Sequence, residues 1–195
     1  MNYHALVPVK HLLYAKSRLA SSLSAKERTD LVLSMLEHVI TILKSCDDIS
    51  KIIVVTTDDH VRTVSSSLGV SAEYDDVIGH NPALTAAAKK EIDAEIDGLL
   101  TISADLPLLT REDIQQMIDL SKLYDVVLAP SKDNGTNALI VKQPLLLPYL
   151  FGENSFDAYE QAAKKADIPY TVHQSETIAF DVDTIEDVKK LATLV

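Results

Sequence analysis

The sequence predicts an α/β protein, built as a single three-layer domain around a mostly parallel, partly mixed sheet. Short continuous apolar runs, of which Ile52–Val55 is the clearest, are typical of strands buried on both faces. These runs alternate with longer segments whose apolar residues recur at helical spacing. The 195 residues, 47% of them hydrophobic, are enough for one sizeable core. No repeat, linker or low-complexity tract divides the chain, so we expect one domain over residues 1–195.

A long helix is predicted between the first two strands. Ala5–Val9 reads as a short apolar strand, and Ser24–Glu27 has the form of a capping box, which starts a helix. Seven apolar residues then recur at helical spacing and predict one buried stripe: Leu31, Val32, Met35, Leu36, Val39, Ile40 and Leu43. We interpret Cys46, the only cysteine, as a further residue of this helix; it cannot form an internal disulfide.

The central part of the chain continues the alternation. A helix near residues 60–68 is followed by a short strand at Ala72–Tyr74. Asn81–Pro82 opens the next helix, because proline suits the first helical position. Leu99–Ala104 is then a buried strand, and another helix starts near Thr110. These elements extend the predicted parallel sheet.

The last part of the chain departs from simple alternation. Strands are predicted at Asp125–Pro130 and Asn137–Val141, with no room for a helix between them. Since a parallel crossover needs a dozen or more residues, this pair is not expected to be a parallel unit of that kind. A short strand at Tyr170–His173 lies between helices near 155–166 and 184–194. We therefore expect the sheet to be mixed here.

The charge of the chain excludes a nucleic-acid surface. The 18 basic and 29 acidic residues leave a net charge of −11, whereas binding to a phosphate backbone needs a basic face. No run of about 18 apolar residues occurs and the N-terminus lacks a signal-peptide pattern, so we expect a cytoplasmic protein with no membrane partner. Residues 1–28 nevertheless hold five basic residues against Glu27: Lys10, Lys16, Arg18, Lys26 and Arg28. This asymmetry indicates a local anionic ligand.

Carboxylates at strand ends predict a metal site. In open α/β sheets ligands bind beyond the carboxyl ends of the strands, where Asp105 follows Leu99–Ala104. Without a partner, Asp105 would be better explained as a cap or turn residue. Asp181 and Asp183, just before the last helix, are its candidate partners. Such carboxylates, with nucleotide phosphates and waters, make the oxygen shell that Mg²⁺ prefers.

The loop after the first strand is suited to binding phosphate through side chains. Residues 9–19 contain no glycine, which excludes a P-loop and a dinucleotide-binding fingerprint, because both need glycine for close backbone approach. Lys10, Lys16 and Arg18 would therefore meet the phosphate charge. A second anion site is indicated by residues 135–137 and 151–155, where glycine, hydroxyl groups and a helix N-terminus occur together.

Five motifs follow one another in a specific order along nearly the whole chain: Val7–Lys10 with Ala15–Leu19, Ala104–Leu109, Gly135–Leu139, Phe151–Phe156 and Asp181–Thr184. In this order they resemble the 2-phospho-L-lactate guanylyltransferases of coenzyme F-420 biosynthesis, which belong to the GT-A-like nucleotidyltransferase superfamily. The resemblance implies a Rossmann-like nucleotide-diphospho-sugar transferase fold.

The resemblance also implies roles for individual residues. With the loop residue Lys10 included, the expected nucleotide-binding set is Lys10, Lys16, Arg18, Asn81 and Asp105. The catalytic residues among them are Lys16, Arg18 and Asp105. Mg²⁺ would be held by Asp105 with Asp183 or Asp181. The phosphorylated acid would be bound by Thr136, Gly152 and Ser155.

The implied reaction transfers GMP from GTP to 2-phospho-L-lactate, releases pyrophosphate and gives lactyl-2-diphospho-5'-guanosine. An acceptor phosphate is already ionised near neutral pH, so positioning and charge neutralisation suffice and no protein nucleophile is needed. Phosphoenolpyruvate and phosphoglycerate carry the same two acidic groups and stay open as acceptors.

Two other kinds of protein are weighed against this reaction. Sugar phosphates and a molybdenum cofactor are acceptors in the same superfamily, and the glycine-free loop argues against them. A non-enzymatic binding or receiver-like module would need an acidic pair after the first strand, where this chain has lysines. No pattern in the sequence sets the oligomeric state, and a homodimer is a working hypothesis.

Overall fold

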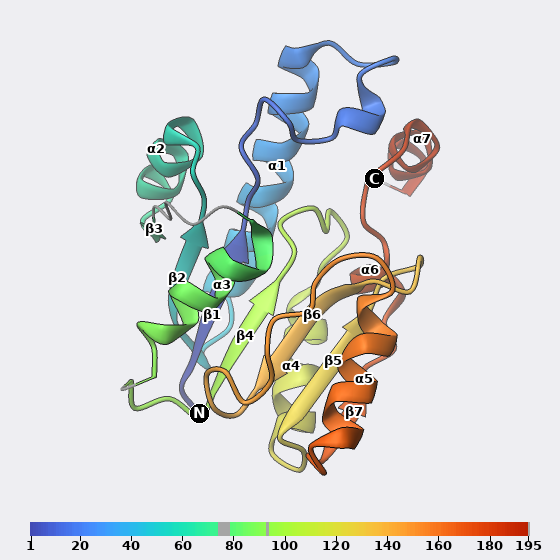
Figure 1. Ribbon diagram of the computed structural model, residues 1–195. Helices are drawn as coiled ribbons and strands as arrows, with labels where there is room; N and C mark the ends of the chain where they lie inside the picture. The colour runs from blue at the N-terminus through green and yellow to red at the C-terminus, as the bar shows by residue number, and fades with distance from the viewer. Residues whose placement is uncertain (74–78, 93, 195) are drawn as a thin grey trace.

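A seven-stranded sheet forms the centre of the computed structural model, which describes residues 1–73, 79–92 and 94–194 (Figure 1). The strands lie in the order β3-β2-β1-β4-β6-β5-β7. Their bounds are β1 Tyr3–Pro8, β2 Ile49–Val55, β3 Ser71–Glu73, β4 Gly98–Ile102, β5 Val126–Pro130, β6 Thr136–Val141 and β7 Tyr170–Val172. Neighbouring strands are parallel except that β6 runs antiparallel to both β4 and β5. The predicted mostly parallel, partly mixed sheet is confirmed.

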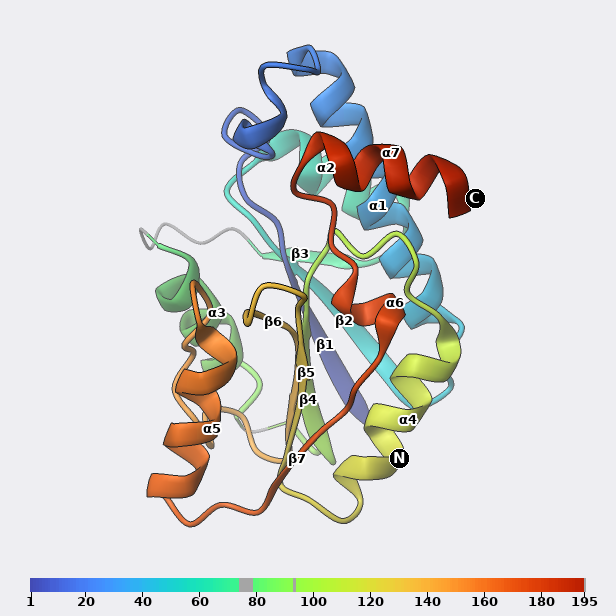
Figure 2. The ribbon, with the colours of Figure 1, turned by 90° about the vertical axis from the view of Figure 1, so that its right-hand side faces the viewer.

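Helices cover both faces of the sheet and give three layers, seen edge-on in Figure 2. One face is covered by α3 (His80–Lys89) and α5 (Ser155–Lys165), and the other by α1 (Ala25–Lys44), α2 (Asp59–Ser67) and α4 (Arg111–Ser121). The 3-10 helix η1 and the helices α6 and α7 complete the described chain, at Ser17–Leu19, Glu176–Ala179 and Ile185–Leu194. None of the helices in the described residues has the length and apolarity that a membrane span needs.

The central strands are buried on both sides because successive side chains of a strand point to opposite faces. In β2, Ile53 packs into the core under α3 and α5, whereas Val54 packs into the core under α1 and α4. Full burial of one such side chain is worth about 1.5–3 kcal/mol. The continuous apolar run in this strand therefore contributes side chains to the cores on both faces of the sheet.

The predicted starts of two helices, α1 and α4, are confirmed by their capping geometry. Ser24 Oγ accepts the Glu27 N–H at 3.3 Å, and a carboxylate oxygen of Glu27 accepts the Ser24 N–H at 2.8 Å. Thr110 and Asp113 form the same reciprocal box at the start of α4. The predicted stripe of α1 is buried except for Leu31, which is partly buried.

Several local predictions are wrong in detail. Helix α3 begins at His80, directly after Gly79 with φ 114°, so Pro82 is the third helical residue and not the first. Cys46 lies beyond the end of α1, buried under the turn that leads into β2, and is not a helix residue. β3 ends at Glu73, and Tyr74 lies outside the described residues. Both η1 and α6 were unexpected, because runs this short carry no periodicity.

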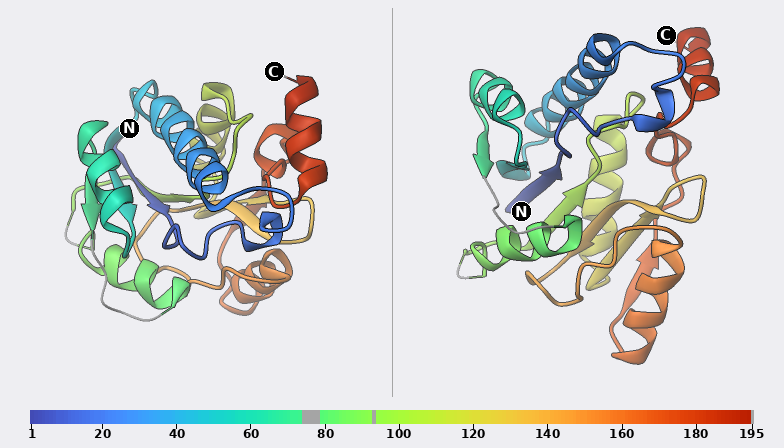
Figure 3. Two further views of the ribbon diagram at one scale, coloured as in Figure 1. Left: turned by 90° about the horizontal axis from the view of Figure 1, so that it is seen from above. Right: turned by 45° about the horizontal axis from the view of Figure 1, so that its top comes forward.

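The topology places one edge of the sheet where ligands bind in open α/β folds. Strands β2 and β3 lie on one side of β1, and β4 to β7 lie on the other side. The direction in which successive strands are added to the sheet therefore reverses beside β1, where ligands bind in such folds. The carboxyl ends of β1, β2 and β4 meet at the upper edge in Figure 1. Antiparallel β6 begins at this edge with Thr136. Seen from above, the segment between β1 and α1 crosses the same edge (Figure 3).

Candidate functional site

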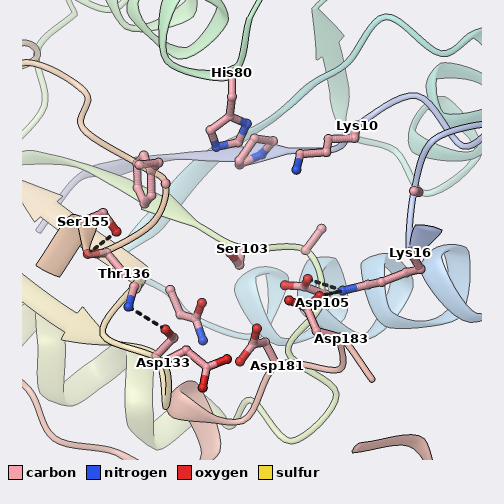
Figure 4. Close-up of a pocket in the computed structure, with 18 of the residues that line it drawn as sticks. Lys10, Lys16, His80, Ser103, Asp105, Asp133, Thr136, Ser155, Asp181 and Asp183 are labelled. Atoms are coloured by element: carbon pink, nitrogen blue, oxygen red, sulfur yellow. Dashed lines mark hydrogen bonds and ion pairs between the residues drawn. The ribbon is translucent and has the colours of Figure 1, made fainter. Parts of the chain in front are cut away.

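A cavity of about 850 Å³ opens at the carboxyl edge of the sheet. Segments that are far apart in the sequence line it, and Figure 4 shows their side chains: residues from 8–18, 103–105, 131–137, 151–155 and 181–183. Most of these segments follow or precede a strand at this edge. The cavity therefore exists only because the parallel strands end together and β6 starts beside them.

The two ends of the cavity differ in chemistry. The charged end consists of Lys16, Asp105, Asp181 and Asp183, and the hydroxyl end consists of Thr136, Gly152 and Ser155. Figure 4 shows Lys16, Asp105 and Asp183 on one side of Ser103, which lies near the tip of β4, and Thr136 and Ser155 on the other. The structure thus brings the predicted metal residues together in one place and the predicted acceptor residues together in another.

The glycine-free loop after β1 is held in place by buried contacts. The Leu12 N–H donates to Asp58 Oδ2 at 2.9 Å, while Asp58 Oδ1 accepts two N–H groups at the start of α2. The side chains of Leu12, Ala15 and Leu19 are buried. Asp58 is therefore a buried structural cap. Lys16 has a φ of 51° in this fixed loop.

The Lys16 ammonium bridges two carboxylates. Its Nζ lies 2.5 Å from Asp105 Oδ2 and 2.9 Å from Asp183 Oδ1, with 9% of the side chain exposed. Burial lowers the pKa of Lys16, but the two carboxylates outweigh burial and hold the pKa above its usual value. Arg18 reaches the other oxygen of Asp183 at 3.5 Å from a largely exposed position. Lys16 is therefore a buried, fully charged group, whereas Arg18 stands at the rim.

Three carboxylates at the charged end fit a magnesium ion. One oxygen from each of Asp105, Asp181 and Asp183 lies within 4.8 Å of the others. Asp181 Oδ1 is buried and has no hydrogen-bond partner among the described residues. Burial and the nearby negative charge of Asp105 raise the pKa of Asp181. Because an unsatisfied buried carboxylate is costly and Mg²⁺ prefers oxygen ligands, the donor set suits this ion, whose binding stays a prediction.

The hydroxyl end lies at the start of α5. Ser155 Oγ donates to Thr136 Oγ1 at 3.2 Å, and both side chains are buried. Gly152 has a φ of 143°, and no heavy atom lies within 4 Å of the position that a Cβ would occupy. Asn154, the N-cap of α5, has a φ of 52°. This arrangement leaves open space beside a helix N-terminus, where anions are favoured.

Asn81 lies apart from the other predicted nucleotide residues. It is the second residue of α3, and its Nδ2 donates to the Phe151 carbonyl oxygen at 2.9 Å. The side chain does not line the cavity, but fixes α3 against the segment that carries Gly152. The nucleotide contact assigned to Asn81 stays a prediction.

A smaller cavity of about 260 Å³ adjoins the first one beside β1 and β2. Lys10, Tyr14 and His80 line both cavities. The end of β2 and the first turn of α3 supply most of its remaining wall, including Thr56 and Ala83. Lys10 thus lies where a ligand occupying both cavities would pass.

Several residues of the large cavity were not among the predicted site residues: Tyr14, His80, Ser103, Asp133 and Asn137. Ser103 and Asn137 had a usable signal, because both lie at strand ends next to residues already singled out. Asn137 also ties β6 to the chain before Asp181, since its Nδ2 donates to the Ile178 carbonyl oxygen at 2.8 Å. His80 had no such signal, because only tertiary packing brings the start of α3 to the cavity.

Solved structures show the same fold. A nucleotide-diphospho-sugar transferase from Desulfovibrio desulfuricans superposes with a TM-score of 0.83 at 16% identity, covering 98% of this chain and 87% of that one. The 4-diphosphocytidyl-2C-methyl-D-erythritol synthase from Anaerococcus prevotii gives 0.68 at 12% identity, covering 99% and 97%. The protein therefore has the nucleotide-diphospho-sugar transferase fold that the sequence motifs implied.

Curated relatives cover almost the whole chain. A phosphoenolpyruvate guanylyltransferase from Sphaerobacter thermophilus is 34% identical over 96% of this chain and 91% of its own. A 2-phospho-L-lactate guanylyltransferase from Methanocaldococcus jannaschii is 31% identical over 95% and 80%, and a 3-phospho-D-glycerate guanylyltransferase from Colwellia psychrerythraea is 28% identical over 100% and 93%. Residues 3–193 match the family described as "Guanylyl transferase CofC like". The chain belongs to this family of guanylyltransferases, and it is a nucleotidyltransferase.

Proposed function

We propose that the protein transfers GMP from GTP to 2-phospho-L-lactate, releasing pyrophosphate and forming lactyl-2-diphospho-5'-guanosine for coenzyme F-420 biosynthesis. The observation that carries this proposal is a single cavity with a cluster of paired charges at one end and a pair of hydroxyl groups at the other. A nucleoside triphosphate needs concentrated positive charge and a metal, whereas a small phosphorylated acid needs an anion cradle. The cavity offers one end for each.

The nucleotide is assigned to the charged end and the smaller cavity. Lys16 and Arg18 lie beside the carboxylates, and Lys10 lies between the two cavities, so the three cations follow one path. We place the triphosphate along this path and the base in the smaller cavity. Mg²⁺, held by Asp105, Asp181 and Asp183, would neutralise charge on the phosphate oxygens when bound. The chain itself supplies cations that orient the triphosphate.

The acceptor is assigned to the hydroxyl end. The hydroxyl groups of Thr136 and Ser155 and the N-terminus of α5 would hold its acidic groups, with Gly152 leaving the space they occupy. An acceptor phosphate oxygen then forms a bond to the α-phosphorus of GTP, while the bond from that phosphorus to the bridging oxygen breaks and pyrophosphate leaves. Binding both substrates in one cavity makes the reaction effectively unimolecular.

Phosphoenolpyruvate is the second candidate acceptor. It carries its phosphate and carboxylate on the same carbons as 2-phospho-L-lactate and differs by a double bond between the second and third carbons, which makes the second carbon planar. The relative from Sphaerobacter thermophilus, named for phosphoenolpyruvate, is 34% identical to this chain, against 31% for the relative from Methanocaldococcus jannaschii, named for 2-phospho-L-lactate. A cradle built from hydroxyl groups and a glycine suits either acid. 3-Phospho-D-glycerate, with its phosphate one carbon further away, would need a longer cradle.

The decisive experiment measures product mass and pyrophosphate release for each acceptor with each of the four nucleoside triphosphates. We expect the 2-phospho-L-lactate adduct of GMP as the main product in the presence of Mg²⁺. A higher kcat/KM with phosphoenolpyruvate or 3-phospho-D-glycerate would move the acceptor assignment to that acid. Transfer from CTP, ATP or UTP in preference to GTP would contradict the nucleotide assignment.

A further inference from the structure

Lys132 forms hydrogen bonds with the chain segment that carries Asp181 and Asp183, two of the candidate metal ligands. It lies in the turn between β5 and β6, outside the lining of the cavity. Its Nζ donates to Asp187 Oδ1 at 2.6 Å and to the Asp181 carbonyl oxygen at 3.0 Å, and it lies 4.0 Å from Asp181 Oδ1. The Lys132 N–H donates to the Ala179 carbonyl oxygen at 3.2 Å. One residue thus contacts residues 179–187 through both its backbone and its side chain.

Asp187 connects Lys132 to Asp183 by hydrogen bonds. While one oxygen of Asp187 accepts from Lys132, the other accepts the N–H groups of Asp183 at 3.0 Å and Thr184 at 2.8 Å. Asp187 therefore links the Lys132 ammonium to the backbone of Asp183 through its two carboxylate oxygens.

The same turn also contacts the hydroxyl end. The Phe156 N–H donates to the Asn134 carbonyl oxygen at 3.2 Å, and Asn134 Nδ2 donates to Asp157 Oδ2 at 2.9 Å. Both partners belong to the first turn of α5, next to Ser155. The turn then leads directly into Thr136, the first residue of β6. Residues 131–135 therefore contact the segments that carry both ends of the cavity.

We propose that Lys132 is a positioning residue, and this role rests on the function proposed above. It fixes the segment of Asp181 and Asp183 against the turn that leads into Thr136. The metal-binding carboxylates and the acceptor-binding hydroxyl groups thereby keep one relative arrangement. Lys132 touches neither substrate, and acts through Asp187 and the backbone of Asp181. Partners of this kind, which orient ligands, typically change metal affinity 10- to 100-fold when they are removed.

An ordinary surface ion pair is the competing interpretation. About a third of the Lys132 side chain is exposed, and exposed pairs contribute little. Removing Lys132 alone would also remove a cation beside the carboxylates, which by charge alone strengthens binding of a metal ion. The two interpretations therefore differ most clearly when the positive and the negative partner are removed together, because the net charge then stays the same.

The test is a titration with Mn²⁺, with and without GTP, of the Lys132→Met/Asp187→Asn double variant. Asparagine keeps an oxygen that can accept the Thr184 N–H. The matched control is Lys122→Met/Asp119→Asn, which removes an exposed pair with the same 2.6 Å separation at the end of α4, outside both cavities. For the Lys132→Met/Asp187→Asn variant we expect the Mn²⁺ affinity to be about 10-fold weaker, at the low end of the 10- to 100-fold range because Lys132 is partly exposed. For the control we expect less than about a 2-fold change in Mn²⁺ affinity, because its pair contacts no candidate ligand.

Unchanged Mn²⁺ affinity in the Lys132→Met/Asp187→Asn variant would overturn the proposal, as would the absence of saturable Mn²⁺ binding to the wild-type protein under both conditions. Melting temperature and circular dichroism check folding. If this variant does not fold, Lys132→Met alone decides: weaker binding supports positioning, and tighter binding overturns it. If the wild-type protein transferred GMP from GTP to none of the acceptors, the proposed function would be refuted. The comparison of Mn²⁺ affinities would still decide the role of Lys132.

Discussion

The two ends of the cavity are built by different means. At the charged end, side chains from the β1 loop, the β4 tip and the segment before α7 are paired with one another, as Lys16 is with Asp105 and Asp183. At the hydroxyl end, the shape depends on backbone conformation, as at Gly152, and on one hydroxyl pair. Changes at the charged end should therefore impair catalysis or the use of GTP, whereas changes at the hydroxyl end should alter the use of the acceptor alone.

The largest effect is expected at the charged end, from Asp105→Asn. If Asp105 holds the metal, losing several kcal/mol of charge stabilisation, taken as about 4 kcal/mol, lowers kcat about a thousand-fold. The side chain is partly exposed and asparagine is nearly isosteric, so the melting temperature should not fall. Pyrophosphate release measures the rate, with Asp119→Asn on α4 as the control. Wild-type rates would remove Asp105 from the metal site.

At the hydroxyl end the corresponding change is Gly152→Val. The φ of 143° at Gly152 is a conformation that side chains rarely adopt, and a side chain there would enter the open space of the cavity. We expect transfer to be blocked while GTP still binds with wild-type affinity, as measured by equilibrium titration. Loss of GTP binding with retained affinity for the acceptor would exchange the two subsites and reverse the comparison between the ends.

Lys16→Met is expected to have an intermediate effect, on the nucleotide. A hydrogen bond to a charged group is worth about 1.5–3 kcal/mol, so the KM for GTP should rise roughly 10- to 150-fold, with a smaller change in the KM for the acceptor. Arg18→Met should do less, because its side chain is 72% exposed and its ion pair is long. Initial rates over both substrates separate the two constants. An unchanged KM for GTP would assign Lys16 a purely structural role with the carboxylates.

How far the sequence predicts the site also differs between the ends. Asp105 could be placed at the charged end from strand order alone, because parallel strands end together at one edge. Glycine and hydroxyl groups indicated a second anion site that includes Thr136 and Ser155, and the family resemblance gave these residues to the acceptor, but nothing local shows that antiparallel β6 starts beside α5. Lys132 carried no signal in the sequence. Hydrophobic periodicity encodes which face of an element is buried, but not which loops meet.

The smallest effect is expected from Ser155→Ala, at the hydroxyl end. Ser155 is 1% exposed and its O–H group donates to Thr136 Oγ1, so its loss removes one neutral hydrogen bond from the cradle that would hold the acceptor. At about 0.5–1.5 kcal/mol, the KM for the acceptor should rise roughly 2- to 13-fold. Initial rates at saturating GTP measure this constant, and the affinity for GTP should not change. Because alanine keeps the start of α5 and the conformation of Gly152, the change tests the hydroxyl group alone. No change in the KM for the acceptor, together with weaker GTP binding, would place the nucleotide at this end.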